Sequence, residues 1–386
     1  MEVSNIIMHP LPQMTNKGER KMKLSKLREK LENNKELRNK QARKIKRLKA
    51  EFKCGVTKEK NRKEEIKIIG ITGSSGKTTV ANIIHEYLKR LGKKSVLYSS
   101  AKIDSPATII RPDEACEITF NSEDDVLEII EEVEAYGAEY LVLEVNETAI
   151  EKGLTKDIPF DVRVLTNFNA LHNEDQYSKE EYKAIKKSFF EGMEKESLCI
   201  YGFEDYDKEF LEELLEANEC KKYVYSSNYI ATVKGVNKED ITSLLYELES
   251  TKAGLQMKVK VKNKTYALKT EMMMDYNALN IVGALTVLEA MGMFDINEYN
   301  TCIQKIKIPG RSEVYQRKGR MIVIDSHLPK VLESLQKLKD KKEINQIKVN
   351  TTTTQEYETQ LKQRGGVSTT LAFSLMICYV IINFIP

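Results

Sequence analysis

Short apolar runs alternate with stretches of helical spacing along most of the chain, and this alternation predicts a layered α/β fold. The first run, residues 66–72, is rich in β-branched side chains and precedes a glycine-rich turn. A helical pattern follows from 77 to 91 and ends at Gly92. The alternation continues with expected strands at 95–99, 140–145, 161–166 and 198–201, and expected helices at 123–136, 179–194 and 206–217. Strands joined by helices in this way form a mostly parallel sheet with helices on both faces.

The pattern changes twice in the second half of the chain. Residues 222–274 carry shorter alternating runs, which are typical of a small antiparallel excursion, and a helix follows at 276–291. A strand at 320–325 and a helix at 329–339 then begin a new βα unit. We interpret this unit as the start of a second, partial Rossmann-like domain.

Charge is distributed unevenly, which the net charge of +3 conceals. Residues 1–65 contain 20 Lys and Arg against 9 Asp and Glu, whereas residues 66–386 contain 41 against 49. The basic segment has a helical pattern from Met22 to Phe52, with polar residues interrupting its heptad positions. Because its charges alternate in sign, we favour a solvated helical arm over a segment that binds nucleic acid or an anionic membrane.

The last 22 residues, 365–386, carry no charged side chain. A run of about 20 apolar residues can cross a bilayer, and Lys362 and Arg364 before it would leave the body of the protein in the cytoplasm. Membrane contact through this tail is therefore one hypothesis. We favour a truncated or frame-shifted gene, because the Thr-rich tract at 350–354 and the tail do not continue the βα alternation.

Composition is that of a soluble globular chain in the cytoplasm. Hydrophobic residues make up 41% and charged residues 31%, whereas a disordered chain would be poorer in apolar residues. The six cysteines are widely spaced and form no C-x-x-C pair. This spacing argues against a zinc ribbon or a disulfide framework and suits a reducing compartment. No signal-peptide pattern opens the sequence.

The strongest chemical signal is a phosphate loop between the first expected strand and the first expected helix. Its residues are Gly73, Ser74, Ser75, Gly76, Lys77, Thr78 and Thr79. Backbone N–H groups of such a loop converge on phosphate oxygens, and the helix N-terminus adds the positive end of its dipole. Lys77 is expected to neutralise the phosphates and the Thr78 hydroxyl to ligate Mg²⁺. The sequence therefore predicts a nucleotide site.

The loop departs from the general P-loop formula, which has a glycine where this chain has Ile71. In this respect it resembles the ATP-binding loop of the Mur ligase family, whose pattern is close to G-x-T-G-T-x-G-K-T-[ST]. Further blocks similar to that family follow in order over residues 66–340. Each block is given by its residues in this chain, with the family's pattern in parentheses. The blocks are 143–147 (E-V-S-S), 165–172 (T-N-L-x-x-D-H), 182–186 (Y-x-x-A-K), 276–280 (F-N-x-x-N), 309–313 (G-R-x-E) and 324–329 (D-Y-A-H-x-P). Leu171 replaces the Asp of the second block, and the last block is one residue short.

The resemblance implies two magnesium sites. Glu144 and Thr78 would hold the Mg²⁺ of the nucleotide, whereas His172 and a carbamylated Lys186 would hold a second Mg²⁺. The chemistry of the residues agrees, because Glu144 follows a parallel strand to the edge where α/β ligand sites assemble, and hard cations prefer carboxylate oxygen. Lys186 can accept CO₂ only as a neutral amine, which requires that burial or nearby cations lower its pKa. Lys77, His172 and Lys186 are therefore the candidate catalytic residues.

Three further residues would contact the nucleotide. By the resemblance, Asn280 meets the adenine, Arg311 reaches the nucleotide and Asp325 binds the ribose, and all three side chains form hydrogen bonds of the required kind. Taken from the residues alone, each site has a structural alternative. Glu144 could cap a strand, His172 could be structural, Lys186 could lie on a solvated helix face, and Arg311 could form an interdomain ion pair.

The reaction that the resemblance implies is ATP-dependent amide-bond formation. A substrate carboxylate attacks the γ-phosphate to give an acyl phosphate and ADP, and an amine then displaces phosphate. The implied partners are ATP, a muramyl-peptide-like carboxylate and an amino acid, as in the synthesis of peptidoglycan precursors in the cytoplasm. Alternatives are a nucleotide-binding homologue without ligase activity, a ligase similar to polyglutamate synthases, and a nucleic-acid-associated ATPase that uses the basic arm.

The same reasoning divides the chain into four segments. They are a basic helical arm at 1–65, a central ATP-binding domain at 66–308, the start of an incomplete C-terminal ligase domain at 309–345, and a polar tract with an uncharged tail at 346–386. The arm is a charged helix and differs from the nucleotide-sugar-binding domain with which family members usually begin.

Overall fold

The computed structural model describes residues 66–105, 109–110, 120, 122–169, 176–204, 206, 208–317, 320–325, 328–341, 346–352 and 377–383. The expected basic arm at 1–65 lies outside the described residues. The polar tract and the tail are described only at 346–352 and 377–383.

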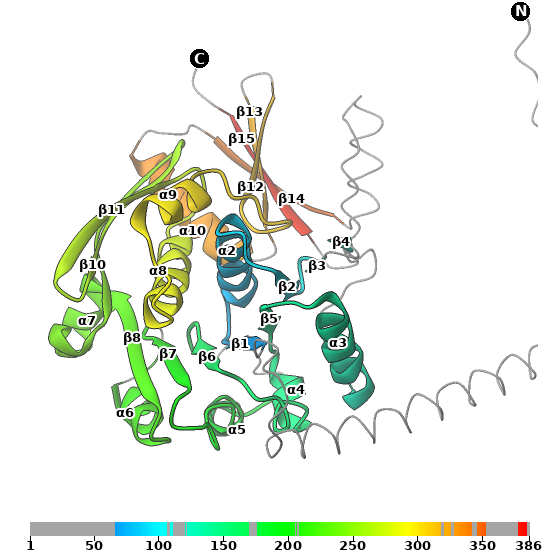
Figure 1. Cartoon of the computed structure of the whole chain (residues 1–386). Helices are drawn as coiled ribbons and strands as arrows, with labels where there is room; N and C mark the ends of the chain where they lie inside the picture. Colours follow the sequence, from blue (N-terminus) through cyan, green and yellow to red (C-terminus); the bar gives the residue numbers. More distant parts are fainter. Residues whose placement is uncertain are drawn as a thin grey trace, which may run out of the picture. The chain divides into compact units, whose positions relative to one another are not determined.

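An eleven-stranded sheet with the order β11-β10-β9-β8-β7-β6-β1-β5-β2-β3-β4 organises the described chain (Figure 1). Every neighbouring pair from β9 to β2 is parallel. These strands are β1 (Lys67–Thr72), β2 (Ser95–Tyr98), β5 (Tyr140–Glu144), β6 (Val162–Leu165), β7 (Leu198–Gly202), β8 (Lys221–Ser227) and β9 (Ser243–Thr251). The two ends are antiparallel and consist of β10 (Gly254–Val261), β11 (Lys264–Thr270), β3 (Ile103–Asp104) and β4 (Ile109–Ile110). The expected parallel α/β sheet with an antiparallel excursion is confirmed.

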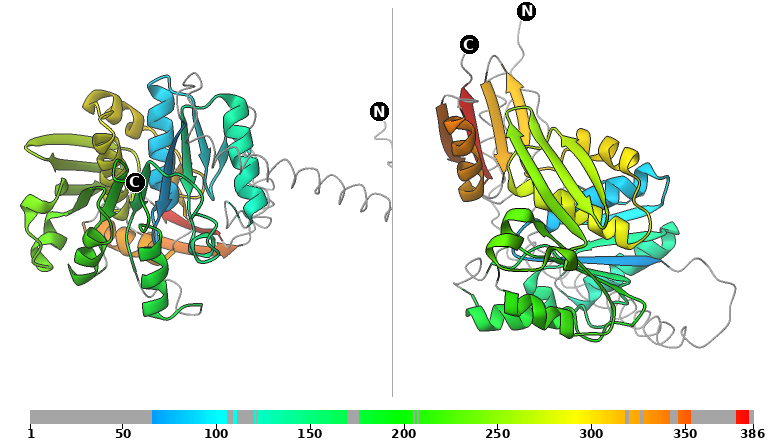
Figure 2. Two further views of the ribbon diagram at one scale, coloured as in Figure 1. Left: turned by 60° about the horizontal axis from the view of Figure 1, so that its bottom comes forward. Right: turned by 90° about the vertical axis from the view of Figure 1, so that its left-hand side faces the viewer.

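Helices cover both faces of this sheet, and each face has its own hydrophobic core (Figure 2). The first core is formed by α2 (Lys77–Arg90), α8 (Tyr276–Ala290) and α9 (Ile296–Gln304). The second is formed by α3 (Glu123–Tyr136), α4 (Glu147–Glu151), α5 (Lys179–Ser188), α6 (Lys208–Glu216) and α7 (Asn228–Val233). Helix α8 is apolar on nearly every side because it packs against both α2 and the sheet.

Strand β1 lies between β5 and β6 and places the following loop at the middle of the sheet. Its side chains alternate, so that Ile69 and Ile71 enter the first core and Ile68 enters the second. At Gly70 a Cβ atom would lie 2.4 Å from the ring of Phe160, which explains the glycine in this buried strand.

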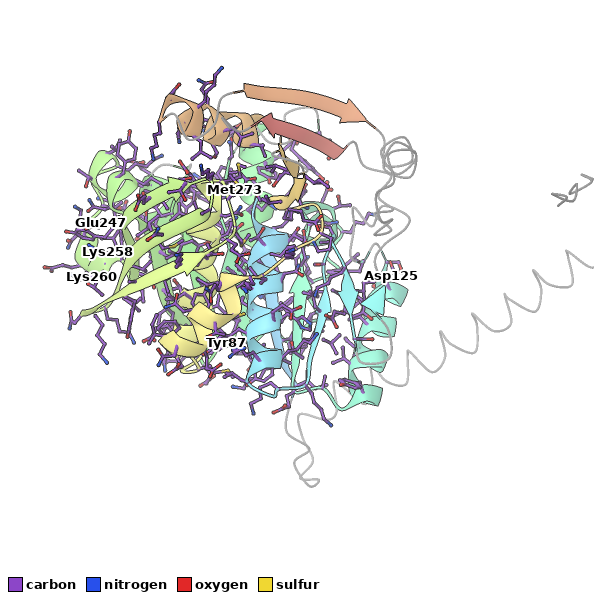
Figure 3. All side chains as sticks on the ribbon, turned by 90° about the horizontal axis from the view of Figure 1, so that it is seen from above. Tyr87, Asp125, Glu247, Lys258, Lys260 and Met273 are labelled. Carbon is purple, nitrogen blue, oxygen red and sulfur yellow. The ribbon has the colours of Figure 1, made fainter. Side chains whose placement is uncertain are left out.

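Strand β10, which forms a hairpin with β9, shows the same alternation near one end of the sheet. Met257 and Val259 are buried, whereas Lys258 and Lys260 are exposed. Figure 3 shows Glu247, Lys258 and Lys260 together on this surface, and Nζ of Lys258 lies 2.8 Å from Oε2 of Glu247. Such an exposed pair contributes about 0–1 kcal/mol, so the buried face is what fixes the hairpin.

A second sheet of four strands follows, with the order β12-β13-β15-β14. It contains β12 (Glu313–Arg317), β13 (Arg320–Asp325), β14 (Gln346–Thr352) and β15 (Ile377–Asn383), and α10 (Leu328–Asp340) follows β13. All three strand pairs are antiparallel, so among the described strands of this sheet none continues the expected βα unit in parallel.

The described part of the uncharged tail is therefore an inner strand. Residues 377–383 form β15, which is hydrogen-bonded to β13 on one side and β14 on the other. No helix in the described ranges is both long enough and apolar enough to cross a membrane. Residues 377–383 of the expected tail therefore pair with β13, a strand of the segment in which the sequence places the start of the C-terminal domain.

Candidate active site

The phosphate loop is the turn between β1 and α2. Thr72 ends β1, Gly73 turns the chain with a φ of 145°, and Gly76 precedes α2 with a φ of 82°. Gly76 provides no side-chain cap, so the loop meets the positive end of the helix directly. Nζ of Lys77 donates to the carbonyl oxygen of Gly73 at 2.8 Å, which folds the ammonium group over the loop. Thr78 and Thr79 are buried in the first turn of α2.

Replacement of Gly76 by alanine should destabilise the loop. The left-handed backbone disfavours any Cβ, and a Cβ here would also lie 2.1 Å from Oδ1 of Asn280. Gly92 is the matched control, because it has a φ of 74° but no atom within 4 Å of its Cβ position. We expect G92A to lose about 1 kcal/mol of unfolding free energy and G76A about 2–3 kcal/mol, measured by urea titration. Equal losses would contradict the steric argument.

The segment after β6 braces the loop. Oδ1 of Asn167 accepts from the backbone N–H of Ser75 at 2.9 Å, and Nδ2 donates to the Ser75 hydroxyl at 2.9 Å. The Thr166 hydroxyl donates to the carbonyl oxygen of Ser75 at 2.5 Å. The Ser74 hydroxyl shares a hydrogen bond of 3.1 Å with the hydroxyl of Tyr182. The Thr-Asn pair that the sequence singled out therefore fixes the shape of the phosphate loop.

Glu144 and Thr78, the expected magnesium ligands, lie together in the fold. The Thr78 hydroxyl donates to Oε1 of Glu144 at 3.2 Å, and Glu144 is only 5% exposed. Ser100, which the sequence analysis missed, joins them: its backbone N–H donates to Oε2 of Glu144 at 2.8 Å. Its hydroxyl also lies 2.9 Å from the Thr78 hydroxyl. A carboxylate with two hydroxyl groups is a donor set that suits a hard cation such as Mg²⁺.

Arg311 reaches this group from the linker between α9 and β12, residues 305–312. One guanidinium nitrogen, Nη2, donates to the Thr78 hydroxyl at 3.2 Å and to the Ser100 hydroxyl at 3.4 Å. The contact joins residues 233 positions apart in the sequence. The structure thus brings Arg311 to the first turn of the helix after the phosphate loop, and its expected contact with the nucleotide stays a prediction.

Lys186 lies beneath the loop and is fully buried. Its Nζ donates to the Thr72 hydroxyl at 3.1 Å and to Oε2 of Glu147 at 3.2 Å. Burial, helped by the nearby charge of Lys77 and opposed by Glu147, lowers the pKa of Lys186 to about 7. The alternative of a solvated helix face is wrong, and the lowered pKa that the sequence analysis required is present.

The structure describes two of the three remaining predicted site residues, Asn280 and Asp325, but not His172. Asn280 lies beside Gly76, and its Nδ2 donates to Oδ1 of Asn277 at 3.2 Å. Asp325 is buried, and its Oδ2 accepts from the backbone N–H of Ser312 and from the Tyr276 hydroxyl, both at 2.7 Å. Asp325 thus holds the linker, and its expected contact with a ribose stays a prediction. His172 lies outside the described residues, so its role as a metal ligand also stays a prediction.

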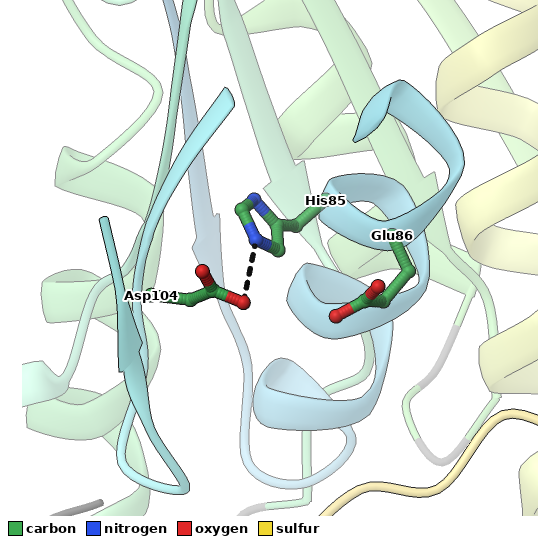
Figure 4. A group of neighbouring side chains, drawn as sticks. All are labelled: His85, Glu86 and Asp104. Atoms are coloured by element: carbon green, nitrogen blue, oxygen red, sulfur yellow. Dashed lines mark ion pairs between the residues drawn. The ribbon is translucent and has the colours of Figure 1, made fainter. Parts of the chain in front are cut away.

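A second group of potential metal ligands lies between α2 and β3, apart from the phosphate-loop residues. Figure 4 shows His85 and Glu86 on this helix and Asp104 on β3, with Nε2 of His85 3.2 Å from Oδ2 of Asp104. Two ammonium groups already neutralise the carboxylates: Nζ of Lys102 contacts Glu86 at 2.6 Å and Asp104 at 3.1 Å, and Nζ of Lys89 contacts Asp104 at 3.1 Å. Burial lowers the pKa of His85. This cluster is an ion-pair network that ties α2 to β3.

Comparison with solved structures shows the same fold in several ligases. A structure of UDP-N-acetylmuramoyl-L-alanyl-D-glutamate--2,6-diaminopimelate ligase has a TM-score of 0.57 and 20% identity, covering 70% of this chain and 54% of that chain. The MurF ligase of Thermotoga maritima in complex with ADP has a TM-score of 0.52 and 20% identity, covering 72% and 55%. Folylpolyglutamate synthase of Mycobacterium tuberculosis, complexed with ADP and AMPPCP, has a TM-score of 0.52 and 15% identity, covering 72% and 67%.

Sequence comparison agrees. The UDP-N-acetylmuramoyl-L-alanyl-D-glutamate--2,6-diaminopimelate ligase of Geobacillus kaustophilus is 23% identical over 282 residues, which are 69% of this chain and 53% of the relative. The protein of the same name from Helicobacter hepaticus is 25% identical over 268 residues, or 67% and 52%. The chain spans about half the length of these curated relatives. Residues 71–288, more than half of the chain, match the Mur ligase middle domain. The chain therefore belongs to the Mur ligase family.

Proposed function

We propose that this chain is an ATP-dependent ligase that joins a substrate carboxylate to an amine. The observation that carries the proposal is the meeting of Thr78, Glu144 and Arg311 at a phosphate loop from three separate parts of the sequence. Loop N–H groups, the dipole of α2 and Lys77 together form a site for the phosphates of ATP. The comparisons support this assignment, because the relatives are named as ligases and two of the similar structures contain ADP.

The proposed reaction has two steps. A carboxylate oxygen attacks the γ-phosphorus, the bond to the β,γ-bridging oxygen breaks, and ADP leaves. An amine nitrogen then attacks the acyl carbon, the bond to the phosphate oxygen breaks, and the amine gives up a proton. Phosphoryl transfer is accelerated mainly by positioning and charge stabilisation, which are the tasks of Lys77 and Arg311 here.

Glu144 and Thr78 fit a divalent cation and would hold Mg²⁺ beside the phosphates. When bound, the ion would neutralise part of the charge of the triphosphate. We propose Asn280 as the contact for the base, because its amide lies directly beside the loop at Gly76. Residues 66–308 form the proposed ATP-binding domain, and residues 309–345 begin a proposed C-terminal ligase domain.

The proposed substrates are a muramyl-peptide-like carboxylate and an amino acid. A panel of UDP-N-acetylmuramoyl peptides and γ-glutamyl acceptors, each with and without amino acids, would be scored for ADP and inorganic phosphate. We expect equal amounts of both products only when a carboxylate and an amine are present together. Tight ATP binding without phosphate release across the panel would overturn the ligase assignment and favour a nucleotide-binding homologue.

A further inference from the structure

The buried Lys186 pairs with the partly buried Glu147, and this pair distinguishes the site from the family motif that residues 143–147 resemble. The similar motif is E-V-S-S, whereas residues 144–147 here read Glu-Val-Asn-Glu, so a carboxylate replaces a small hydroxyl at position 147. Oε2 of Glu147 lies 3.2 Å from Nζ of Lys186, and the two side chains are 16% and 0% exposed. The substitution therefore acts directly on the lysine for which carbamylation was expected.

The fold holds Glu147 firmly in this place. Helix α4 begins at Glu147, and the Asn146 side chain caps it by accepting from the backbone N–H of Ala149 at 2.8 Å. A negative side chain is favourable in the first turn of a helix. Helix α4 packs against α5, which carries Lys186. The position of the carboxylate is thus set by the backbone as well as by the lysine.

Glu147 is also connected to the phosphate loop. Lys186 bridges it to the hydroxyl of Thr72, the last residue of β1 before the loop begins. Glu144, three residues earlier, contacts Thr78 and Ser100. The short connection from β5 to α4 therefore supplies two carboxylates to one site, one toward the first turn of α2 and one toward the end of β1.

An adduct of CO₂ on Lys186 would conflict with this arrangement. The Nζ atom is enclosed by the Thr72 hydroxyl, the Glu147 carboxylate and the ring of Tyr182, whose centroid is 5.1 Å away. A carbamate is an anion, so its formation would place two negative groups side by side in a buried space. The lowered pKa of Lys186 favours the neutral amine that reacts with CO₂, so the obstacle is the neighbouring carboxylate and not the protonation state.

We propose that Glu147 takes the place expected for a carbamate on Lys186. Glu147 would then be the second carboxylate, after Glu144, that offers an oxygen ligand to a cation in this active site. Lys186 remains an unmodified amine that positions Glu147. The inference rests on the proposed function, because a second carboxylate matters only where phosphoryl transfer is carried out. It predicts that the activity of this chain does not depend on CO₂ or bicarbonate.

The modification state can be measured without any turnover. The full chain would be equilibrated with ¹³C-bicarbonate and its ¹³C NMR spectrum searched for a lysine carbamate, with K186M as the reference. We expect wild-type and K186M spectra without a carbamate signal. A wild-type signal that disappears in K186M would overturn the proposal, whether or not the chain proves to be a ligase.

The role of Glu147 needs a matched pair of variants. E147Q keeps the size of the side chain and removes its charge, and E151Q makes the same change at the other end of α4, where Glu151 accepts from the Tyr177 hydroxyl at 2.8 Å. We expect E147Q to bind ADP with wild-type affinity and to release phosphate at least tenfold more slowly, and E151Q to match the wild type. Wild-type phosphate release by E147Q would refute the role of Glu147. Absence of phosphate release in the wild type itself would count against the proposed function, and the NMR result would stand apart from it.

Discussion

Replacement of Lys77 by methionine should lower the rate of phosphate release by about 10²–10³-fold, the usual loss when one preorganised charge donor is removed from a reaction centre. The Nζ atom of Lys77 lies over the loop, where it contacts the carbonyl oxygen of Gly73 at 2.8 Å. A cation in this position neutralises phosphate charge that increases on the leaving ADP during transfer. Methionine has a similar length and no charge, so the loop should keep its shape.

Arg90 provides the control for this experiment, because it lies at the other end of α2 and forms an exposed pair with Glu298 at 2.6 Å. R90M removes one positive charge from the same helix, and an exposed ion pair of this kind contributes about 0–1 kcal/mol. We expect R90M to release phosphate at the wild-type rate and K77M to retain the wild-type unfolding transition. If K77M kept more than a tenth of the wild-type rate, Lys77 would not be the phosphate-neutralising group.

The centre of the fold could be predicted because local and long-range signals agree there. Strand β1 and helix α2 were expected at nearly their observed bounds, since the apolar run, the glycines and the helical spacing occur in one stretch of sequence. Helix α3 was expected at 123–136 and is observed at Glu123–Tyr136, where Ser122 and Asp125 form a capping box and Gly137 follows.

Other elements could not be predicted, because tertiary contacts decide them. The helix expected at 179–194 ends at Ser188, since Phe189 and Phe190 turn into the second core. Strand β15 was read as part of an uncharged tail, and only its pairing with β13 and β14 makes it a strand. Apolar runs of this kind do not reveal from sequence whether they enter a sheet or a membrane.

The site shows the same division between local and distant signals. Glu144, Lys77 and Arg311 were found from motifs, whereas Ser100 was not, because its importance depends on sheet register. β5 pairs with β1 on one side and β2 on the other, with Ile71 opposite Glu144 and Tyr98 opposite Leu143. This register brings the residues that follow β2 to the carboxylate. The general rule that ligands bind at the carboxyl ends of parallel strands was the available clue.

Lys186 should make the unfolding free energy of the protein rise with pH, and the variant K186M should lack this rise. Its pKa is lowered to about 7 in the folded chain by burial and by Lys77, whereas a lysine in the unfolded chain has a pKa of about 10.4. Between these values the unfolded state binds more protons than the folded state, so the unfolding free energy rises with pH. The slope for one such group is at most about 1.4 kcal/mol per pH unit, and the gain from pH 7 to pH 9 is about 2 kcal/mol.

K186M should lack this increment, and urea titrations at pH 7, 8 and 9 in CO₂-free buffer would measure it as the difference between the two proteins. Lys187 is the matched control, since it is the next residue of α5, is 35% exposed and pairs with Glu213 at 3.1 Å. K187M should therefore follow the wild-type pH dependence. Parallel curves for wild type and K186M would mean that Lys186 keeps its proton in the folded chain. Glu147 would then hold the buried side chain as an ammonium ion. Its effect of raising the pKa of Lys186 would outweigh the effect of burial, which lowers it.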